Sequence, residues 1–172
     1  DVGAHVGFYT LLASELVGKT GKVFAFEPLP RNINYLKKHI NINKCKNITI
    51  IENALSNKSG NSFFKINSSS STGQITNKEG LKIISATIDN LVFKNKLPVP
   101  HSLKIDVEGA ELSVLRGAIN TLKKYYPAIF LSTHSSEINK HCRNLLSGLG
   151  YNLKSISGNS IEKTNEIFAY KK

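Results

Sequence analysis

Short apolar segments alternate with segments of helical periodicity along most of this chain. Apolar residues at three- and four-residue spacing predict helices, and short runs rich in β-branched and aromatic residues predict strands. Regular alternation of this kind predicts an α/β fold with a mostly parallel sheet. We expect helices over 7–17, 30–43, 110–125 and 136–150, and strands over 22–27, 48–52, 62–66, 81–88, 102–107 and 128–133.

The last two expected strands, 151–156 and 166–171, flank a turn region at Gly158 and Asn159. Two strands so close in sequence form an antiparallel hairpin. A parallel sheet that ends in an antiparallel hairpin differs from the plain dinucleotide-binding fold. Between the expected strands 62–66 and 81–88, the serine-rich residues 68–73 predict either a passive linker or a lid.

The composition is that of one globular domain spanning residues 1–172, of which 40% are hydrophobic. No apolar run reaches the roughly 18 residues that a membrane crossing requires, so we expect no membrane partner. Within the expected helix 110–125, four apolar side chains at helical spacing are expected in the core: Leu112, Leu115, Ile119 and Leu122.

The cysteine content bears on the cellular location of the protein, and the charge bears on whether it binds nucleic acid. Cys45 and Cys142 are the two cysteines, too few for a disulfide framework, and they suit a cytoplasmic location. The formal net charge is +11, almost all from dispersed lysines. We interpret the densest group as a solvated face rather than a nucleic-acid site. Its members are Lys37, Lys38, Lys44 and Lys46.

The first chemical motif is DVGAHVG, residues 1–7, which leads directly into a helix. Gly3 and Gly7 permit close approach of a ligand to the backbone, and a helix N-terminus offers free N–H groups. His5 occupies the position where a dinucleotide fingerprint has its second glycine. An acid at the mouth of the loop, Asp1, would repel a phosphate and suit a cationic ligand. S-adenosylmethionine carries an ammonium and a sulfonium and no phosphate.

Two further segments follow expected strands at the carboxyl edge, where open α/β sheets bind ligands. Glu27 ends the strand 22–27, 20 residues after Gly7, where a nucleoside site has an acid for the ribose hydroxyls. Asn53, Ala54 and Leu55 follow the strand 48–52, and small groups there can flank an adenine ring. The alternative for Glu27 is an exposed acid at a strand end.

The remaining chemistry lies after two later strands. Asp106 and Glu108 follow the buried strand 102–107 in the motif KIDVEGAE, and buried carboxylates are costly unless used or paired. His134 ends the strand 128–133 and is expected on the same rim as Asp106, where a histidine can act as a base. The alternatives are helix capping by Glu108 or Glu111 and a structural role for His134.

Five motifs in order resemble the FkbM family of methyltransferases. They are DVGAHVGFYTLLAS, VFAFEPLPRNINYLKKHININ, NALSNKSG, KIDVEGAELSVLRGA and AIFLSTHS. The similarity runs from Asp1 to about Ser135, and KIDVEGAELSVLRGA is its most specific part. The resemblance implies a Rossmann-like class I methyltransferase fold, S-adenosyl-L-methionine as donor, and often a sugar or natural-product hydroxyl as acceptor.

Carried over by position, the resemblance assigns roles to individual residues. It places Asp1, Gly3 and Gly7 in the loop beside the methionine part of the donor, Glu27 at the ribose, and Asp106 and Glu108 among the acids after the fourth strand. The family usually has asparagine where this chain has His5. It also has a strand before the position of Asp1, so we expect a domain truncated at its N-terminus.

The sequence therefore predicts an S-adenosylmethionine-dependent methyltransferase that acts on oxygen of a small-molecule acceptor. Asp106 is the first candidate for the base or acceptor-orienting group, followed by His134 and Glu108, with no metal. An alternative is that Asp106, Glu108 and His134 together hold a divalent metal. The other functional alternatives are a non-catalytic binding module for nucleic acid or a protein partner, and an NAD-dependent oxidoreductase.

Overall fold

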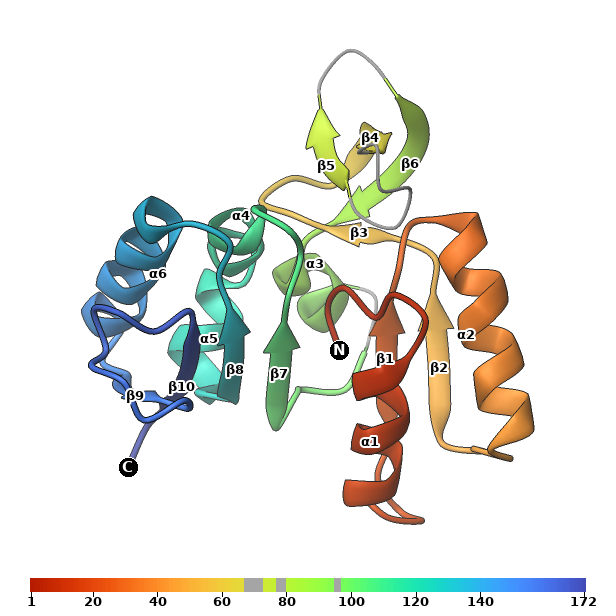
Figure 1. The fold of residues 1–172 in the computed structure, drawn as a ribbon, viewed down its shortest axis with the longest axis horizontal. Coiled ribbons are helices and arrows are strands. Elements are labelled where there is room, and N and C mark those ends of the chain that lie inside the picture. Colours follow the sequence, from red (N-terminus) through yellow and green to blue (C-terminus); the bar gives the residue numbers. More distant parts are fainter. Residues whose placement is uncertain (67–72, 77–79, 95–96) are drawn as a thin grey trace. The chain divides into compact units, whose positions relative to one another are not determined.

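A computed structural model describes residues 1–66, 73–76, 80–94 and 97–172, and helices and strands alternate as predicted except for the consecutive strands β2 to β6 over residues 48–86 (Figure 1). The chain divides into two compact units, which are described separately. Unit 1 comprises Asp1–Ala54 and Asn61–Ser85, and unit 2 comprises Leu55–Gly60 and Ala86–Lys172.

Unit 1 begins with alternating helices and strands close to the predicted bounds. These are α1 (Phe8–Leu16), β1 (Val23–Phe26), α2 (Pro30–Ile42) and β2 (Ile48–Ile51). β1 and β2 run parallel, with Val23 opposite Ile48 and Phe26 opposite Ile51. Val2 forms a parallel bridge with Phe26, which places the start of the loop 1–7 at the carboxyl end of β1.

A small apolar core holds the first part of unit 1 together. Pro30 suits the first turn of α2 because a proline there loses no helical hydrogen bond. From α2, Leu36 packs with Ala4 of the loop and Ala25 of β1, all fully or almost fully buried, and Ile40 and Ile48 pack against this cluster. The loop 1–7 is thereby attached to both β1 and α2.

A second sheet, which the sequence analysis did not predict as a sheet, has the strand order β3-β6-β4-β5. Its strands are β3 (Ala54–Leu55), β4 (Gly60–Ile66), β5 (Gly73–Thr76) and β6 (Leu81–Ala86). The prediction of a strand over 62–66 is confirmed within β4. The predicted linker or lid at 68–73 lies outside the described residues except for Gly73, which begins β5.

The strand predicted over 81–88 is too long by two residues. β6 ends at Ala86, and the Thr87 hydroxyl accepts a hydrogen bond from the Asn90 N–H at 3.0 Å. Threonine at this position caps α3 (Ile88–Phe93), a helix that the sequence analysis did not predict. The last residue of β6, Ala86, is therefore followed directly by the N-cap of α3, Thr87.

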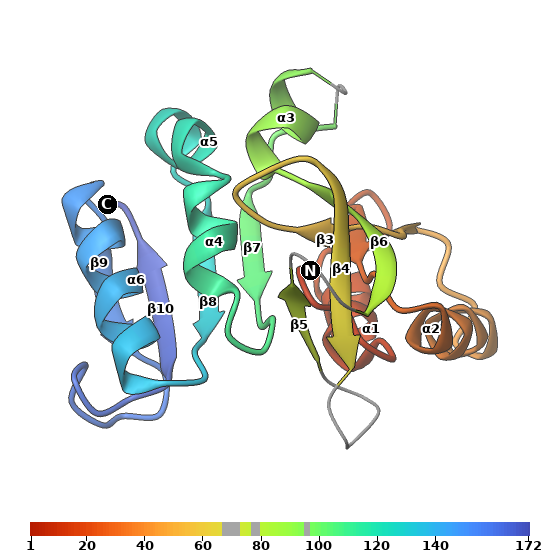
Figure 2. The same ribbon diagram turned by 90° about the horizontal axis from the view of Figure 1, so that it is seen from above.

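Unit 2 contains β7 (Ser102–Ile105), α4 (Glu111–Arg116), α5 (Ile119–Tyr125), β8 (Ala128–Ser132), α6 (Ser136–Gly148), β9 (Asn152–Ser155) and β10 (Glu166–Tyr170). The strand order is β7-β8-β10-β9. β7 and β8 are parallel, and β10 is antiparallel to both β8 and β9. The predicted antiparallel hairpin at the end of the chain is confirmed. α4 and α6 pack side by side (Figure 2).

The single helix predicted over 110–125 is wrong, because the chain divides it into α4 and α5 at Gly117. The Gly117 carbonyl accepts a hydrogen bond from the Asp89 N–H at 2.9 Å. A Cβ at Gly117 would lie 2.0 Å from the backbone carbonyl oxygen of Ser56. The Asp89 carboxylate then accepts the N–H groups of Asn120 and Thr121 at the start of α5. A contact distant in sequence thus ends one helix and caps the next.

The four side chains predicted as core in this region divide into two pairs. Leu115 and Leu122 are fully buried, as predicted, whereas Leu112 and Ile119 are only half-buried. The break at Gly117 changes the rotational phase between the two helices, so one apolar stripe does not run through both. Among the described helices, none combines the length and apolar character needed to cross a bilayer.

Candidate functional site

The loop 1–7 has an unusual backbone, with Gly3, His5 and Gly7 all at positive φ, at 80°, 51° and 103°. Glycine adopts such values without strain, and histidine and asparagine tolerate the left-handed region better than most other residues. This explains how His5 can stand where the family usually has asparagine. The N–H groups of Gly3 and Ala4 both donate to the Phe26 carbonyl, at 3.1 and 3.0 Å.

Gly7 is required for the junction between this loop and α1. It is the N-cap of α1, and a Cβ there would lie 2.5 Å from Cδ1 of the buried Leu36. At the other end of the loop, the Thr10 hydroxyl donates a 2.6 Å hydrogen bond to Oδ2 of Asp1. His39 of α2 is half-buried, and its Nδ1 lies 2.7 Å from the Val6 carbonyl oxygen.

Glu27 is buried, with 4% of its surface exposed, so the alternative of an exposed strand-end acid is wrong. Its Oε2 accepts the His5 N–H at 2.8 Å, and its Oε1 accepts the Leu29 N–H at 3.0 Å and the Asn32 side-chain amide at 3.1 Å. A carboxylate offers about four acceptor positions, so three donors leave room for a further one. Glu27 therefore ties the loop 1–7 to the start of α2.

The segment after β2 is more enclosed than a simple turn. Ala54 and Leu55 form the short strand β3 and are buried, with 6% and 3% exposure, while Asn53 is half-buried. The role of these three residues beside an adenine stays a prediction.

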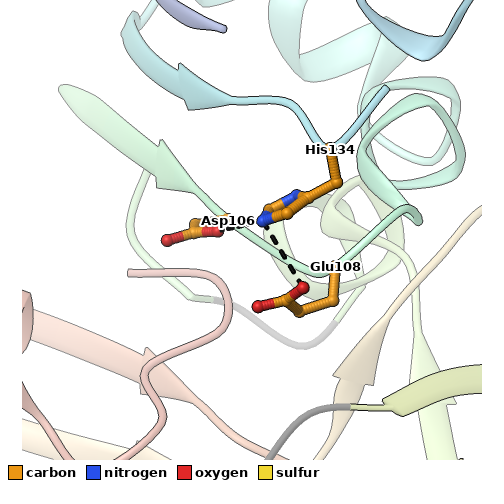
Figure 3. A group of neighbouring side chains, drawn as sticks. All are labelled: Asp106, Glu108 and His134. Carbon is orange, nitrogen blue, oxygen red and sulfur yellow. Dashed lines mark ion pairs between the residues drawn. The ribbon is translucent and has the colours of Figure 1, made fainter. Parts of the chain in front are cut away.

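In unit 2, two acids lie on the turn between β7 and α4. Ile105, at the end of β7, is fully buried, and Asp106 follows it directly with 29% of its side chain exposed. Glu108 and Gly109 both have positive φ, at 52° and 102°, and α4 begins two residues after Gly109. This turn directs both carboxylates to the same place (Figure 3).

His134 brings β8 into the same group. Its Nε2 lies 3.5 Å from Oδ1 of Asp106 and 3.5 Å from Oε2 of Glu108 (Figure 3). Thr133, on one side, hydrogen-bonds the Asn165 carbonyl, and Ser135, on the other, caps α6 by accepting the Ile138 N–H at 3.2 Å. The structure thus places Asp106, Glu108 and His134 together on one rim, as the sequence predicts.

Glu111 orients His134, a contact that sequence reasoning missed. The Glu111 side chain has no exposed surface, and its Oε1 lies 2.7 Å from Nδ1 of His134. The same oxygen accepts the Gly109 N–H at 2.9 Å. With Nδ1 held by Glu111, the other ring nitrogen, Nε2, faces Asp106 and Glu108.

A signal for Glu111 exists in the sequence. It shares one face of α4 with Val114 and Leu115, both buried, so it is a carboxylate at a position where the pattern requires an apolar residue. A buried charge in such a position is either paired or functional. Lys104 of β7 was also missed: its Nζ lies 3.6 Å from Oδ2 of Asp106.

The charges around His134 change its protonation. Burial lowers the pKa of His134, but the hydrogen bond to Glu111 and the charges of Glu108, Glu111 and Asp106 outweigh it, so the pKa lies above its usual value of 6.5. Near Glu111, burial raises the pKa of the Cys142 thiol to about 12, and the charge of Glu111 contributes. Cys142 is therefore an unreactive core residue.

The likeness to known proteins agrees with this geometry. Residues 1–153 match the model of the methyltransferase FkbM domain. Hexuronic acid methyltransferase AglP from Haloferax volcanii is 31% identical over 126 residues, which are 72% of this chain and 50% of that protein. The chain therefore spans about half the length of this curated relative.

Two solved structures share the fold. Methyltransferase FkbM from Methylobacillus flagellatus KT has a TM-score of 0.69 and 19% identity, with 99% of this chain and 42% of that chain covered. Aeropyrum pernix fibrillarin, solved with natively bound S-adenosyl-L-methionine, has a TM-score of 0.57 and 15% identity, covering 98% of this chain and 63% of that chain. These likenesses confirm the class I methyltransferase fold, and with the match over residues 1–153 they show that the chain belongs to the FkbM methyltransferase family.

Proposed function

We propose that this chain is the catalytic core of an S-adenosylmethionine-dependent methyltransferase that methylates an oxygen atom of a sugar or natural product. One observation carries the proposal: the positive-φ loop 1–7 is held by the buried carboxylate of Glu27, in a chain of the FkbM family. The family match runs through both units, which supports a single methyltransferase domain over 1–172.

The donor-binding role falls to residues of unit 1 and the adjoining strand β3. The loop residues Asp1, Gly3, His5 and Gly7 would lie beside the methionine part of S-adenosylmethionine. Glu27 keeps an acceptor position for the ribose hydroxyls, as a charge-assisted hydrogen bond. The segment Asn53–Ala54–Leu55 would flank the adenine.

The acceptor chemistry falls to unit 2. An acceptor oxygen attacks the methyl carbon in line with the departing sulfur, the carbon–sulfur bond breaks, and its electron pair returns to sulfur to give neutral S-adenosylhomocysteine. The proton of the acceptor hydroxyl must leave, and Asp106 is the first candidate to take it or to orient the hydroxyl. His134 is the second candidate, and Glu108 completes the group.

The name of the relative suggests an acceptor. AglP is a hexuronic acid methyltransferase, so we extend the acceptor proposal to sugar acids, whose hydroxyl and carboxyl oxygens are both possible methylation sites. The nucleic-acid alternative is not favoured, because residues 1–153 match the FkbM methyltransferase domain and the curated relative is a hexuronic acid methyltransferase. A cytoplasmic location remains part of the proposal and is consistent with free thiols at Cys45 and Cys142.

Calorimetry with S-adenosylhomocysteine and NAD tests the proposal. We expect the protein to bind S-adenosylhomocysteine and not NAD, because the loop offers Asp1 and no dinucleotide glycine pattern to the ligand. Tight NAD binding without any response to S-adenosylhomocysteine would contradict the assignment. Methyl transfer from labelled donor to a panel of sugars and sugar acids would then identify the acceptor.

A further inference from the structure

Asp106, Glu108 and His134 present three potential metal ligands on one rim of unit 2 (Figure 3). One ligand atom from each lies within 4.8 Å of the others, and Nε2 of His134 is 3.5 Å from each carboxylate oxygen. These separations exceed the usual range of a hydrogen bond. Ligand atoms held about 2.1 Å from one ion lie roughly 3.0–3.5 Å from each other. The spacing therefore suits an ion between the three side chains.

Glu111 supplies an independent observation outside this trio. Metal-ligating histidines almost always donate their second ring N–H to a carboxylate or carbonyl, which fixes the tautomer and the ring orientation. Glu111 does this for His134 at 2.7 Å from a position with no exposed surface. The ring is thus held with Nε2 toward Asp106 and Glu108.

The Glu111 carboxylate also lacks compensation on its second oxygen. Its Oε2 is buried and has no hydrogen-bond partner among the described residues. A fully buried carboxylate with one unpartnered oxygen is costly unless a positive charge lies nearby. A cation on the far side of the His134 ring would supply that charge through the imidazole.

The local charge balance leads to the same conclusion. Asp106, Glu108 and Glu111 carry three negative charges around His134, and Lys104 compensates one of them at 3.6 Å from Asp106. The carboxylates around the His134 ring therefore outnumber the lysine beside them, in a protein whose formal net charge is +11. A divalent cation would offset this local excess of acidic groups.

We propose that Asp106, Glu108 and His134 bind one divalent metal ion of the Mn²⁺ or Mg²⁺ class, with Glu111 as the residue that positions His134. Two carboxylate oxygens and one imidazole nitrogen suit Mn²⁺ well, and Mg²⁺ accepts the same oxygens with water completing its shell. Three protein ligands leave positions open for oxygens of an acceptor. This acceptor role rests on the proposed function, whereas ion binding itself does not. With the ion bound, Asp106 and His134 would orient the acceptor through the ion.

Titration of the chelator-treated protein with Mn²⁺, followed by the electron paramagnetic resonance signal of the free ion, tests the proposal. We expect one Mn²⁺ per chain, displaced by excess Mg²⁺. Glu108→Gln and His134→Gln should abolish this binding, and Glu111→Gln should weaken it by about 10–100-fold, the usual effect of losing an orienting carboxylate. Glu52→Gln, which removes an exposed charge paired with Lys37, is the matched control and should bind like the wild type.

A second readout locates the ion. Bound Mn²⁺ should broaden the amide NMR signals of residues 106–110 and 134 in the wild type and not in His134→Gln. Two results would overturn the metal site: no stoichiometric binding of Mn²⁺ by the wild type, or Mn²⁺ affinities of Glu108→Gln and His134→Gln equal to that of the wild type. Binding of S-adenosylhomocysteine, measured on the same samples, separates the two hypotheses: donor binding without Mn²⁺ binding refutes the metal site alone, and Mn²⁺ binding without donor binding refutes the methyltransferase alone.

Discussion

Oε1 of Glu111 lies 2.7 Å from Nδ1 of His134, and the Glu111 carboxylate has no exposed surface. This contact is one of the causes of the raised pKa of His134, after the opposing effect of burial. We expect Glu111→Gln to lower the pKa of His134, because glutamine keeps an acceptor oxygen but removes the charge. NMR titration of the His134 ring in the presence of a chelator measures the change.

Glu137→Gln is the matched control for this titration. Glu137 is an exposed acid of α6 that lies 3.8 Å from His141, so its removal changes the net charge equally without touching His134. We expect the pKa of His134 to stay unchanged in this variant. A similar decrease in both variants would mean that Glu111 acts only through net charge and not through its hydrogen bond.

The raised pKa of His134 also gives the sign of a pH effect on stability. A histidine whose pKa is raised on folding stabilises the fold fully below its unfolded value, about 6.5, and this contribution is lost as the pH rises through the folded pKa. We expect the difference in free energy of unfolding between the wild type and His134→Gln to shrink as the pH rises above about 6.5. Urea unfolding at several pH values with a chelator present measures it, and a difference that grows with pH would contradict the assignment.

Glu27→Ala should weaken S-adenosylhomocysteine binding by about 1–3 kcal/mol, the usual cost of leaving polar groups unpaired. The change removes the proposed acceptor for the ribose and the acceptor of the His5 N–H. Asn32→Ala is the control, since it removes one donor to the same carboxylate and keeps the carboxylate. Unfolding of each variant is measured in parallel, and full donor affinity in a folded Glu27→Ala would show that Glu27 only supports the loop.

Gly7→Ala should destabilise the protein by about 1–3 kcal/mol more than Gly18→Ala. Both glycines have positive φ, at 103° and 68°, so both substitutions strain the backbone. Only at Gly7 does the new Cβ also meet a core side chain, Leu36, whereas nothing lies within 4 Å at Gly18. Urea unfolding compares the two variants. Equal destabilisation would mean that Leu36 moves aside without cost.

Local signals in the sequence were sufficient for several features of the fold. Pro30 at the start of α2, the glycine before α1 and the serine that caps α6 act on backbone groups within a few residues, so their effect is visible in sequence. The rim position of Asp106 and His134 followed from the rule that parallel strands end at one edge. These residues share the rim as predicted.

Features that depend on distant contacts were missed. The break at Gly117 depends on Asp89 and Ser56, which lie about 30 and 60 residues away in sequence, and helical periodicity does not contain such contacts. The role of Glu111 required knowledge that α4 turns this carboxylate toward β8. The strands β3 and β5 are short and gain their stability from neighbours in the sheet, so neither was predicted from its own residues.

Asp106→Asn should leave S-adenosylhomocysteine binding nearly unchanged and lower turnover by about 10² or more, a typical loss when an acid–base group is removed. Asparagine keeps the size and one acceptor oxygen of aspartate, but it cannot take a proton and is a weak metal ligand. Donor binding should persist because Asp106 is not among the proposed donor-binding residues. Asp89→Asn is the control: Asp89 accepts the N–H groups of Asn120 and Thr121, so its loss should lower stability without a selective loss of turnover.

Steady-state kinetics on an identified acceptor, with and without added Mn²⁺, then distinguish the two roles of Asp106, metal ligand and direct contact with the acceptor. Partial recovery with excess Mn²⁺ indicates a metal ligand, and a metal-independent loss indicates direct contact with the acceptor. Full activity of Asp106→Asn would exclude both roles and shift the chemistry to His134.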